Sequence, residues 1–173
     1  MGRKEELEAE VSGRVWEYAD IAAADLVFSP ELFKACEADR CGNYNKNWAC
    51  PPAAGTLEEH RKKILAFPRV FVFTTRYGLE DSFDIVGMGK ARELHNRLTR
   101  EIHRKFGKTN PVYGAGACTL CGTCAYPAPC RFPGEVFPPV EAAGINVAEL
   151  SRAGGLKYHN GPDTVTYFSM VLF

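Results

Sequence analysis

The chain has 173 residues, of which 46% are hydrophobic and 12% aromatic, so it can form one domain with a sizeable core and needs no disulfide or metal merely to fold. Its 21 basic and 21 acidic residues cancel, which excludes a strong overall attraction to nucleic acid or to an anionic membrane. The sequence has no apolar stretch long enough to cross a bilayer and no secretory signal, so we expect a cytoplasmic protein.

The predicted elements begin after a charged segment, residues 1–13, that we expect to be peripheral. A short strand is predicted at residues 26–28. The first clear helix is predicted over residues 57–66, because Thr56 and Glu59 have the spacing of a capping box. The chain before this helix is rich in asparagine, glycine and proline, which predicts an irregular loop.

The chain from residue 69 onward contains the strongest periodic signals. Residues 69–75 are β-branched and aromatic and apolar on both faces, which predicts an inner strand. Apolar residues at intervals of three and four predict a helix over residues 91–106, with Gly107 as its C-cap. Strands are predicted over residues 110–117, where glycines indicate a bulge or a close backbone approach, and over residues 164–173.

Together these elements predict a single domain, residues 1–173, of the α+β or α/β class. We expect a single-layer mixed sheet with two main helices and two cysteine-rich metal-binding loops at its edge. Residues 90–108, around the second helix, carry seven basic and two acidic side chains, which suit either a solvated face or docking of an acidic electron-transfer partner. Aromatic residues are scarce there, so we expect no nucleic-acid partner.

The clearest chemical signal is the C-terminal cysteine segment, residues 118–130. Cys118, Cys121 and Cys124 follow one another at intervals of three, and Cys130 comes after five further residues. Small residues between them let backbone amides turn inward around a four-iron cluster. The run approaches the bacterial ferredoxin pattern but has a longer last interval, and its proline precedes the fourth cysteine.

An N-terminal cysteine segment, residues 36–52, contains the other three cysteines. Four residues separate Cys36 from Cys41, and eight separate Cys41 from Cys50. A proline follows Cys50 directly, which is typical of the last ligand of ferredoxin-type clusters. Trp48 is predicted either to shield a cluster from water or to pack in the core.

Three interpretations of the seven cysteines compete. In a reducing compartment, cysteine clusters indicate metal or redox chemistry rather than disulfides, and an iron–sulfur site fits the spacing. Structural zinc also takes four thiolates, although a zinc knuckle leaves Cys124 surplus. Unliganded buried thiols are the third interpretation, but these rarely cluster between prolines and glycines.

Seven thiols can be divided between clusters in more than one way, because one cubane takes four thiolates and two take eight. One division groups the three N-terminal cysteines with Cys130 and leaves the others to a second cluster with an open iron or a non-cysteine ligand. Another joins Cys118, Cys121 and Cys124 to Cys50 or Cys130 in one cluster and makes the remainder structural.

Two arginines and one histidine are further candidates. Arg40 and Arg131 each adjoin a cysteine, and a guanidinium group beside a negatively charged cluster raises its reduction potential. The alternative is an ordinary loop arginine. His159 lies in a predicted loop and is a candidate non-cysteine ligand, although surface or hydrogen-bonded histidines are more common.

The cysteine motifs resemble those of an uncharacterised family of predicted metal-binding proteins, the domain of unknown function 2284. The resemblance rests on Gly-Ala-Cys-Thr-Leu-Cys-Gly-Thr-Cys-Ala-Tyr-Pro from Gly116, on Pro-Cys-Arg-Phe-Pro and Glu-Ala-Ala-Gly-Ile-Asn-Val after it, and on Cys-x4-Cys-x2-Tyr-x3-Trp-x-Cys-Pro-Pro from Cys36. It extends from about Asp25 to the C-terminus. It implies metal binding through these cysteines, expected as iron–sulfur, and no established reaction.

The leading hypothesis is an iron–sulfur protein with one or two 4Fe–4S clusters, serving in electron transfer or as the cluster-bearing component of a redox enzyme. Its expected partner is a redox protein, with no membrane involved. A zinc-stabilised scaffold is the alternative, and an enzyme that uses an open cluster iron is the third hypothesis. The candidate cofactor and metal ligands are Cys36, Cys41, Cys50, Cys118, Cys121, Cys124 and Cys130.

Overall fold

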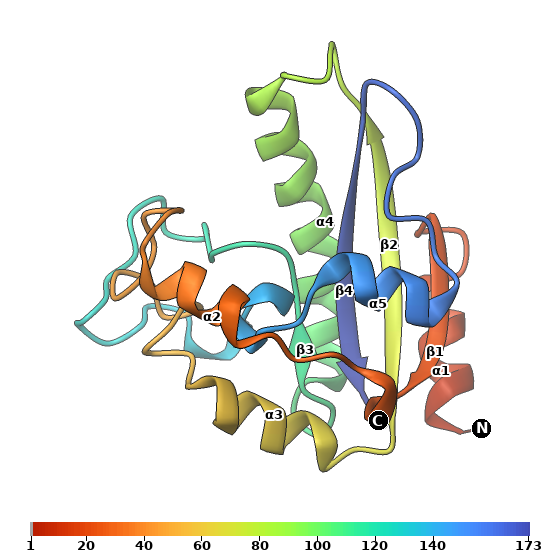
Figure 1. Ribbon diagram of the computed structural model, residues 1–173, viewed down its shortest axis with the longest axis horizontal. Helices are drawn as coiled ribbons and strands as arrows, with labels where there is room; N and C mark the ends of the chain where they lie inside the picture. The colour runs from red at the N-terminus through yellow and green to blue at the C-terminus, as the bar shows by residue number, and fades with distance from the viewer. Residues whose placement is uncertain (1) are drawn as a thin grey trace.

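The computed structural model describes residues 2–173, in which a four-stranded sheet lies between two layers of helices (Figure 1). The elements are, in chain order, α1 (Arg3–Val11), β1 (Glu17–Ala22), η1 (Ala23–Asp25), α2 (Pro30–Glu37), α3 (Leu57–Leu65), β2 (Arg69–Gly78), α4 (Ile85–Phe106), β3 (Val112–Tyr113), η2 (Pro133–Glu135), η3 (Val140–Ala143), α5 (Val147–Gly154) and β4 (Thr164–Leu172).

The sheet has the strand order β1-β2-β4-β3. The α+β class is confirmed, but all three strand pairs within residues 2–173 are antiparallel, where a mixed sheet was expected. β2 and β4 form the centre and pair from Val70 opposite Leu172 to Gly78 opposite Thr164. The prediction that residues 69–75 form an inner strand is therefore confirmed, because β2 has a neighbour on each side.

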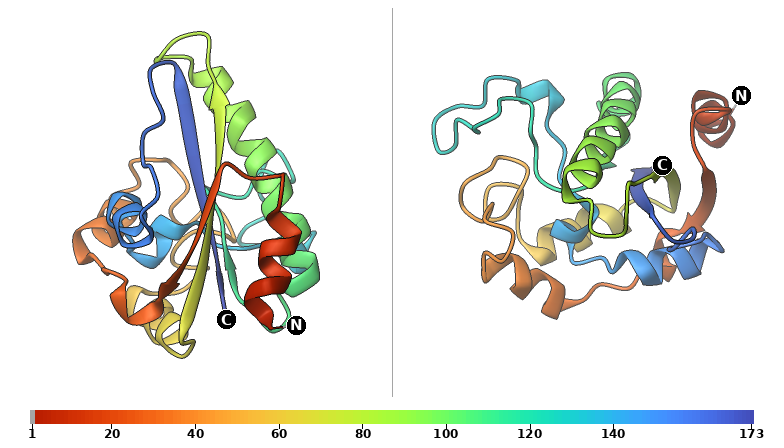
Figure 2. Two further views of the ribbon diagram at one scale, coloured as in Figure 1. Left: turned by 90° about the vertical axis from the view of Figure 1, so that its right-hand side faces the viewer. Right: turned by 90° about the horizontal axis from the view of Figure 1, so that it is seen from above.

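Helices cover both faces of the sheet, as Figure 2 shows with the sheet seen nearly edge-on in its left panel. Side chains of β2 alternate between the two faces: Phe71 and Phe73 pack in one core with α1 and α4, and Val70 and Val72 pack in the other with α3 and α5. All four side chains are fully buried. This explains why the strand is apolar on both faces. No helix within residues 2–173 is long and apolar enough to cross a membrane.

The predicted helices are confirmed, with small changes at their ends. α3 begins with the expected capping box: the Thr56 hydroxyl accepts a hydrogen bond from the Glu59 amide (3.2 Å), and the Glu59 carboxylate accepts one from the Thr56 amide (2.7 Å). α4 starts earlier than the apolar periodicity indicates, because Asp84 caps its N-terminus by accepting a hydrogen bond from the Gly87 amide (2.7 Å). Its C-cap is Gly107, as predicted.

Three parts of the chain differ from the prediction. Residues 1–13 are expected to be peripheral, but α1 packs on the sheet through Leu7 and Val11, which lie four residues apart on one helical face and are fully buried. The strand predicted at residues 26–28 is reduced to an isolated bridge between Phe28 and Ile145, and β1 forms the sheet edge instead. The strand predicted over residues 110–117 is only two residues long.

β3 ends at Tyr113 because the chain then turns at Gly114 and Gly116, where it passes close to the side chains of Phe137 and Arg92. A Cβ atom at Gly114 would lie 2.3 Å from the Phe137 ring, and Gly116 has a φ of +66°. Beyond Gly116 the chain enters a region without helices or strands that projects from the sheet. We call residues 36–52 and 117–132, which lie side by side there, the cysteine lobe (Figure 1).

Candidate metal centre

Contacts between polar and aromatic side chains join the two segments of the cysteine lobe. The rings of Trp48 and Tyr126 meet edge to face, with their centroids 5.1 Å apart. The side-chain hydrogen bonds run from Asn47 Nδ2 to the Cys118 carbonyl (2.9 Å), from Trp48 Nε1 to the Ala128 carbonyl (2.9 Å) and from the Tyr126 hydroxyl to Asn45 Oδ1 (2.7 Å). Cysteines about eighty residues apart in the chain are thereby brought into one region.

The four cysteines of the C-terminal segment line one small pocket, which we call the four-thiol pocket: Cys118, Cys121, Cys124 and Cys130. Trp48 reaches across from the other segment and forms part of its wall. The remaining lining residues are mostly apolar and comprise Leu120, Ala125, Arg131, Phe132 and Val136. Trp48 is therefore beside the thiols, and its predicted role in shielding a cluster from water stays a prediction.

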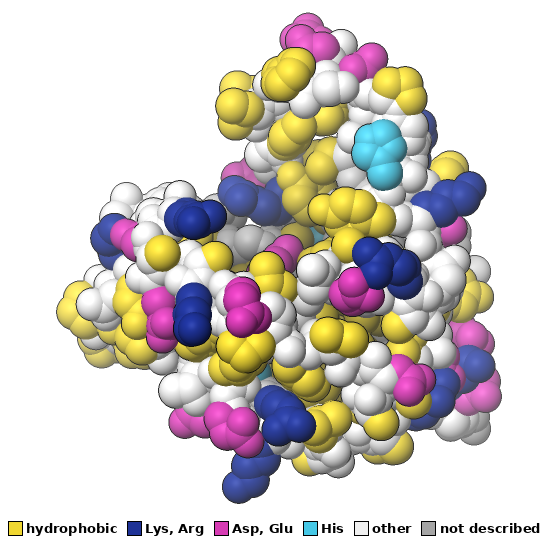
Figure 3. Space-filling model, in the orientation of Figure 1, with side chains coloured by type: hydrophobic (Ala, Val, Ile, Leu, Met, Phe, Trp, Pro, Cys, Tyr) yellow, Lys and Arg dark blue, Asp and Glu magenta, His cyan; other side chains and the backbone are white. Residues whose placement is uncertain are grey.

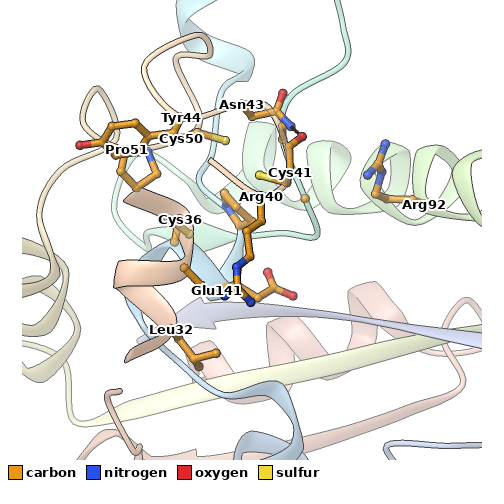
Figure 4. Close-up of a pocket in the computed structure, with 15 residues that line it drawn as sticks. Leu32, Cys36, Arg40, Cys41, Asn43, Tyr44, Cys50, Pro51, Arg92 and Glu141 are labelled. Carbon is orange, nitrogen blue, oxygen red and sulfur yellow. Dashed lines mark hydrogen bonds between the residues drawn. The ribbon is translucent and has the colours of Figure 1, made fainter. Parts of the chain in front are cut away.

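The three cysteines of the N-terminal segment line a larger space of about 340 Å³, which we call the three-thiol cavity. Figure 4 shows Cys36, Cys41 and Cys50 directed toward the same space, with Arg92 facing it from α4. On the molecular surface, Figure 3 shows a hollow with acidic and basic side chains at its rim, where the lobe meets the rest of the molecule. Cys36 belongs to α2, and the other two cysteines lie in the loop that follows.

The structure therefore groups the thiols as four and three. Cys130 lines the pocket of Cys118, Cys121 and Cys124, and it does not line the cavity of the N-terminal cysteines. Within residues 2–173, no three histidine, cysteine, aspartate or glutamate side chains are close enough to hold a single metal ion. His159 is exposed and lines neither space, and its Nδ1 atom accepts a hydrogen bond from the Gly161 amide (3.3 Å).

The electrostatics of the thiols link the two spaces. Burial raises the pKa of the Cys50 thiol to about 12, and neighbouring thiols of both segments, Cys36 and Cys41 on one side and Cys118 and Cys124 on the other, add to that rise. Burial also raises the pKa of the Cys36 and Cys118 thiols. Cys50 lines the three-thiol cavity but is thus close enough to Cys118 and Cys124 for their charges to act on it. Metal binding must displace protons from these thiols, because the thiolate is the ligand.

The surroundings of Cys118 act on its pKa in opposite directions. The Leu120 backbone and the positive charge of Arg100 lower the pKa of the Cys118 thiol, against the larger effect of burial, which raises it. Gly122 has a φ of +68°, which allows the loop to reverse between Cys121 and the next cysteine. The inward turn of the other amides toward a cluster stays a prediction from the small residues between the cysteines.

The sequence motifs and this geometry agree with the comparison to protein families. Residues 19–173 match the model of a family described as predicted metal-binding protein (DUF2284). The chain belongs to this family. No curated protein and no solved structure matches the chain significantly. The family is one of predicted metal-binding proteins, and both motifs contain cysteines, whose thiolates are common metal ligands.

Sequence reasoning found the cysteines but missed several of their neighbours. Arg40 and Arg131, which were noted beside cysteines, line the three-thiol cavity and the four-thiol pocket, respectively. Arg92 and Glu141 also line the three-thiol cavity but come from distant parts of the chain. Asn47 carries the hydrogen bond to the other segment, and no pattern in the sequence distinguishes it from the asparagines around it.

Proposed function

We propose that the protein binds a 4Fe–4S cluster through Cys118, Cys121, Cys124 and Cys130 and transfers single electrons. The observation that carries this proposal is that these four cysteines line one pocket. Four thiolates are the usual ligands of such a cluster, and cysteines at intervals of three are typical of its binding loop. The donor set therefore fits the group. When bound, a cluster of this kind supplies a one-electron redox couple.

The side chains around the four-thiol pocket suit a redox site. Trp48 and Val136 limit access of water on one side, and an apolar surrounding tunes the reduction potential. Leu120 and Phe132, which also line the pocket, are 39% and 48% exposed, so part of its rim reaches the surface. Electron exchange requires such an approach, and we expect a redox protein to dock there.

Two arginines favour the thiolate forms and the reduced state of the site. Arg131 lines the four-thiol pocket, and its side chain donates a long hydrogen bond to the Thr123 carbonyl (3.5 Å). Arg100 lies close enough to Cys118 to lower the pKa of its thiol. Positive charge beside a cluster with four thiolates raises its reduction potential.

Metal analysis of the protein purified without oxygen tests the proposal. We expect about four iron and four sulfide per chain at this site, with a broad absorbance at about 400 nm that bleaches on reduction by dithionite. The double variant Cys121→Ser/Cys124→Ser should lose this iron. Thr123→Ser, a substitution in the same loop that touches no thiol, is the matched control and should retain it.

Zinc is the outcome that would contradict the proposal. Four thiolates also bind tetrahedral zinc, which is colourless and has no redox chemistry, although the thiols of this pocket would have to move closer together to hold one ion. About one zinc per chain, with negligible iron after anaerobic reconstitution, would assign the lobe to a structural role. The search would then be for a binding partner of a zinc-stabilised scaffold.

A further inference from the structure

The three-thiol cavity differs from the four-thiol pocket in having room for a ligand. Its volume of about 340 Å³ lies within the range of small-molecule sites. Its walls are largely apolar and include Leu32 and Pro51. Among the described residues, Cys36, Cys41 and Cys50 are the thiols that line it, so a cubane held there has one iron without a cysteine.

Positive charge faces this cavity without a matching partner. The Nε atom of Arg92 is buried and has no hydrogen-bond partner in the described structure. Neither Arg92 nor Arg40 forms an ion pair within residues 2–173. A buried guanidinium nitrogen without a partner is costly, and an anion relieves that cost. Glu141 also lines the cavity, so two positive side chains face one negative side chain.

The backbone makes the space that Arg92 uses. Gly116 has a φ of +66°, and a Cβ atom there would lie 3.0 Å from Arg92 Cδ and 3.1 Å from its Nη1. A side chain at this position would require the Arg92 side chain to shift by a few tenths of an ångström, and the positive φ would strain it. In Figure 4, Arg92 on α4 lies on one side and the three cysteines lie on the other.

We infer that Cys36, Cys41 and Cys50 hold a second iron–sulfur cluster and that a small carboxylate anion binds in the cavity beside it. This inference rests on the proposed iron–sulfur function. Guanidinium groups bind carboxylates through paired hydrogen bonds, and Arg92 and Arg40 supply them here. An iron without a thiolate ligand accepts an oxygen donor as a Lewis acid. The cavity is thus a substrate or effector site, and the four-thiol pocket is an electron-transfer site.

Iron counting in paired variants separates this inference from the proposed function. We expect about eight iron atoms per reconstituted wild-type chain and about four in each of the variants Cys36→Ser/Cys41→Ser and Cys121→Ser/Cys124→Ser. If wild type and Cys36→Ser/Cys41→Ser both hold about four, the inference fails and the proposed function stands. If Cys121→Ser/Cys124→Ser loses no iron, the proposed function fails.

Ligand binding is then measured by electron paramagnetic resonance of the reduced Cys121→Ser/Cys124→Ser protein, which retains the N-terminal thiols. Malonate, the probe, should shift the signal in a saturable way, and inorganic phosphate at the same concentration should not. Adding Arg92→Gln should raise the dissociation constant for malonate about tenfold or more. Arg97→Gln, an exposed arginine on the same helix outside the cavity, is the matched control and should leave it unchanged.

Two results would overturn the carboxylate site. The first is a signal that malonate leaves unchanged while Glu141→Gln alters it, which would make Glu141 the fourth ligand of the cluster. The second is a shift by phosphate in place of malonate, which would assign the cavity to another anion. Circular dichroism of each variant shows whether the sheet and helices remain folded.

Discussion

The layered body and the cysteine lobe are built on different principles. Both faces of the sheet carry buried apolar side chains, with Phe71, Val72 and Met170 among those fully buried. By contrast, none of the described residues from 116 to 136 is buried, and burial in the other segment of the lobe is confined to a few residues around Ala49 and Cys50. The lobe, residues 36–52 and 117–132, contains no strand. Apolar burial therefore stabilises the body, whereas the lobe depends on a few hydrogen bonds and on what its thiols bind.

This contrast indicates how the protein responds to loss of metal. The body has its own core, so we expect it to fold without help from the lobe, whereas metal binding to thiolates would supply folding free energy in the lobe. The predictions below alter one region at a time and ask whether the other responds. They run from the largest expected effect to the smallest.

The largest effect is expected in the core between α1, α4 and the sheet. Phe71→Ala removes a fully buried ring that stacks on Tyr18 at a centroid distance of 5.5 Å, and it should lower the free energy of unfolding by about 3–5 kcal/mol. Urea denaturation followed by circular dichroism measures this. Phe71→Leu, which largely preserves volume, should cost less than about 1.5 kcal/mol. Iron bound per folded chain should not change, and its loss would show that the two regions are coupled.

A second effect in the body is a pH dependence due to His95. This side chain is fully buried between Thr75 Oγ1 (2.7 Å from Nδ1) and Ser169 Oγ (2.7 Å from Nε2). Burial lowers the pKa of His95 to about 3. The unfolded state takes up the proton at higher pH than the folded state does, so stability falls as pH decreases from 6.5 toward about 3.

Between pH 7 and pH 5 this histidine should cost about 2 kcal/mol of folding free energy. Urea denaturation of wild type and His95→Gln at both pH values isolates the contribution of His95. Whatever its stability at pH 7, the variant should lose about 2 kcal/mol less than wild type does between the two pH values. Burial also lowers the pKa of His60, to about 4, so the stability of the variant should still depend on pH to some extent. Equal pH dependence in both proteins would show that His95 is not protected from protonation.

Much of the body was predictable from sequence because its signals are local and periodic. The capping box at Thr56 and the apolar spacing through Phe106 gave correct helices, and the run from Arg69 gave a correct inner strand. α1 was missed because its apolar residues are few and its periodicity is weak. α2 is amphipathic but only eight residues long, and its start at Ser29-Pro30 was not recognised as a helix cap. α5 did carry a signal, since Asn146 caps its N-terminus.

The lobe was predictable in its residue types but not in its grouping. Cysteine spacing identified all seven candidate ligands, whereas the association of Cys130 with the other C-terminal cysteines depends on where the loop leads after Pro127. The approach of the two segments depends on Trp48 and Asn47, whose partners are a backbone carbonyl each. Such contacts leave no periodic pattern in a sequence, so the grouping required a structure.

A smaller effect, confined to the lobe, is expected from Trp48→Ala. The substitution removes the hydrogen bond to the Ala128 carbonyl and the edge contact with Tyr126, and should cost about 1–2 kcal/mol of local stability. Hydrogen exchange should become faster over residues 118–130 and stay unchanged in the sheet. Trp48→Phe keeps an aromatic ring but lacks the hydrogen-bond donor, so its exchange rates should lie between those of wild type and Trp48→Ala. Slower exchange, or a change spread over the whole chain, would contradict a lobe that opens by itself.

The smallest effect tests the junction at which the N-terminal cysteine segment ends and α3 begins. Thr56→Ala removes the hydroxyl that accepts a hydrogen bond from the Glu59 amide, and loss of an N-cap lowers the free energy of unfolding by about 1 kcal/mol. Thr56→Ser retains the acceptor and should behave as wild type. Because α3 belongs to the body through buried Ile64, amides of α3 should exchange faster while those of residues 36–52 do not. If both accelerate together, the lobe and the body open as one unit, and the metal would then stabilise the whole fold rather than the lobe alone.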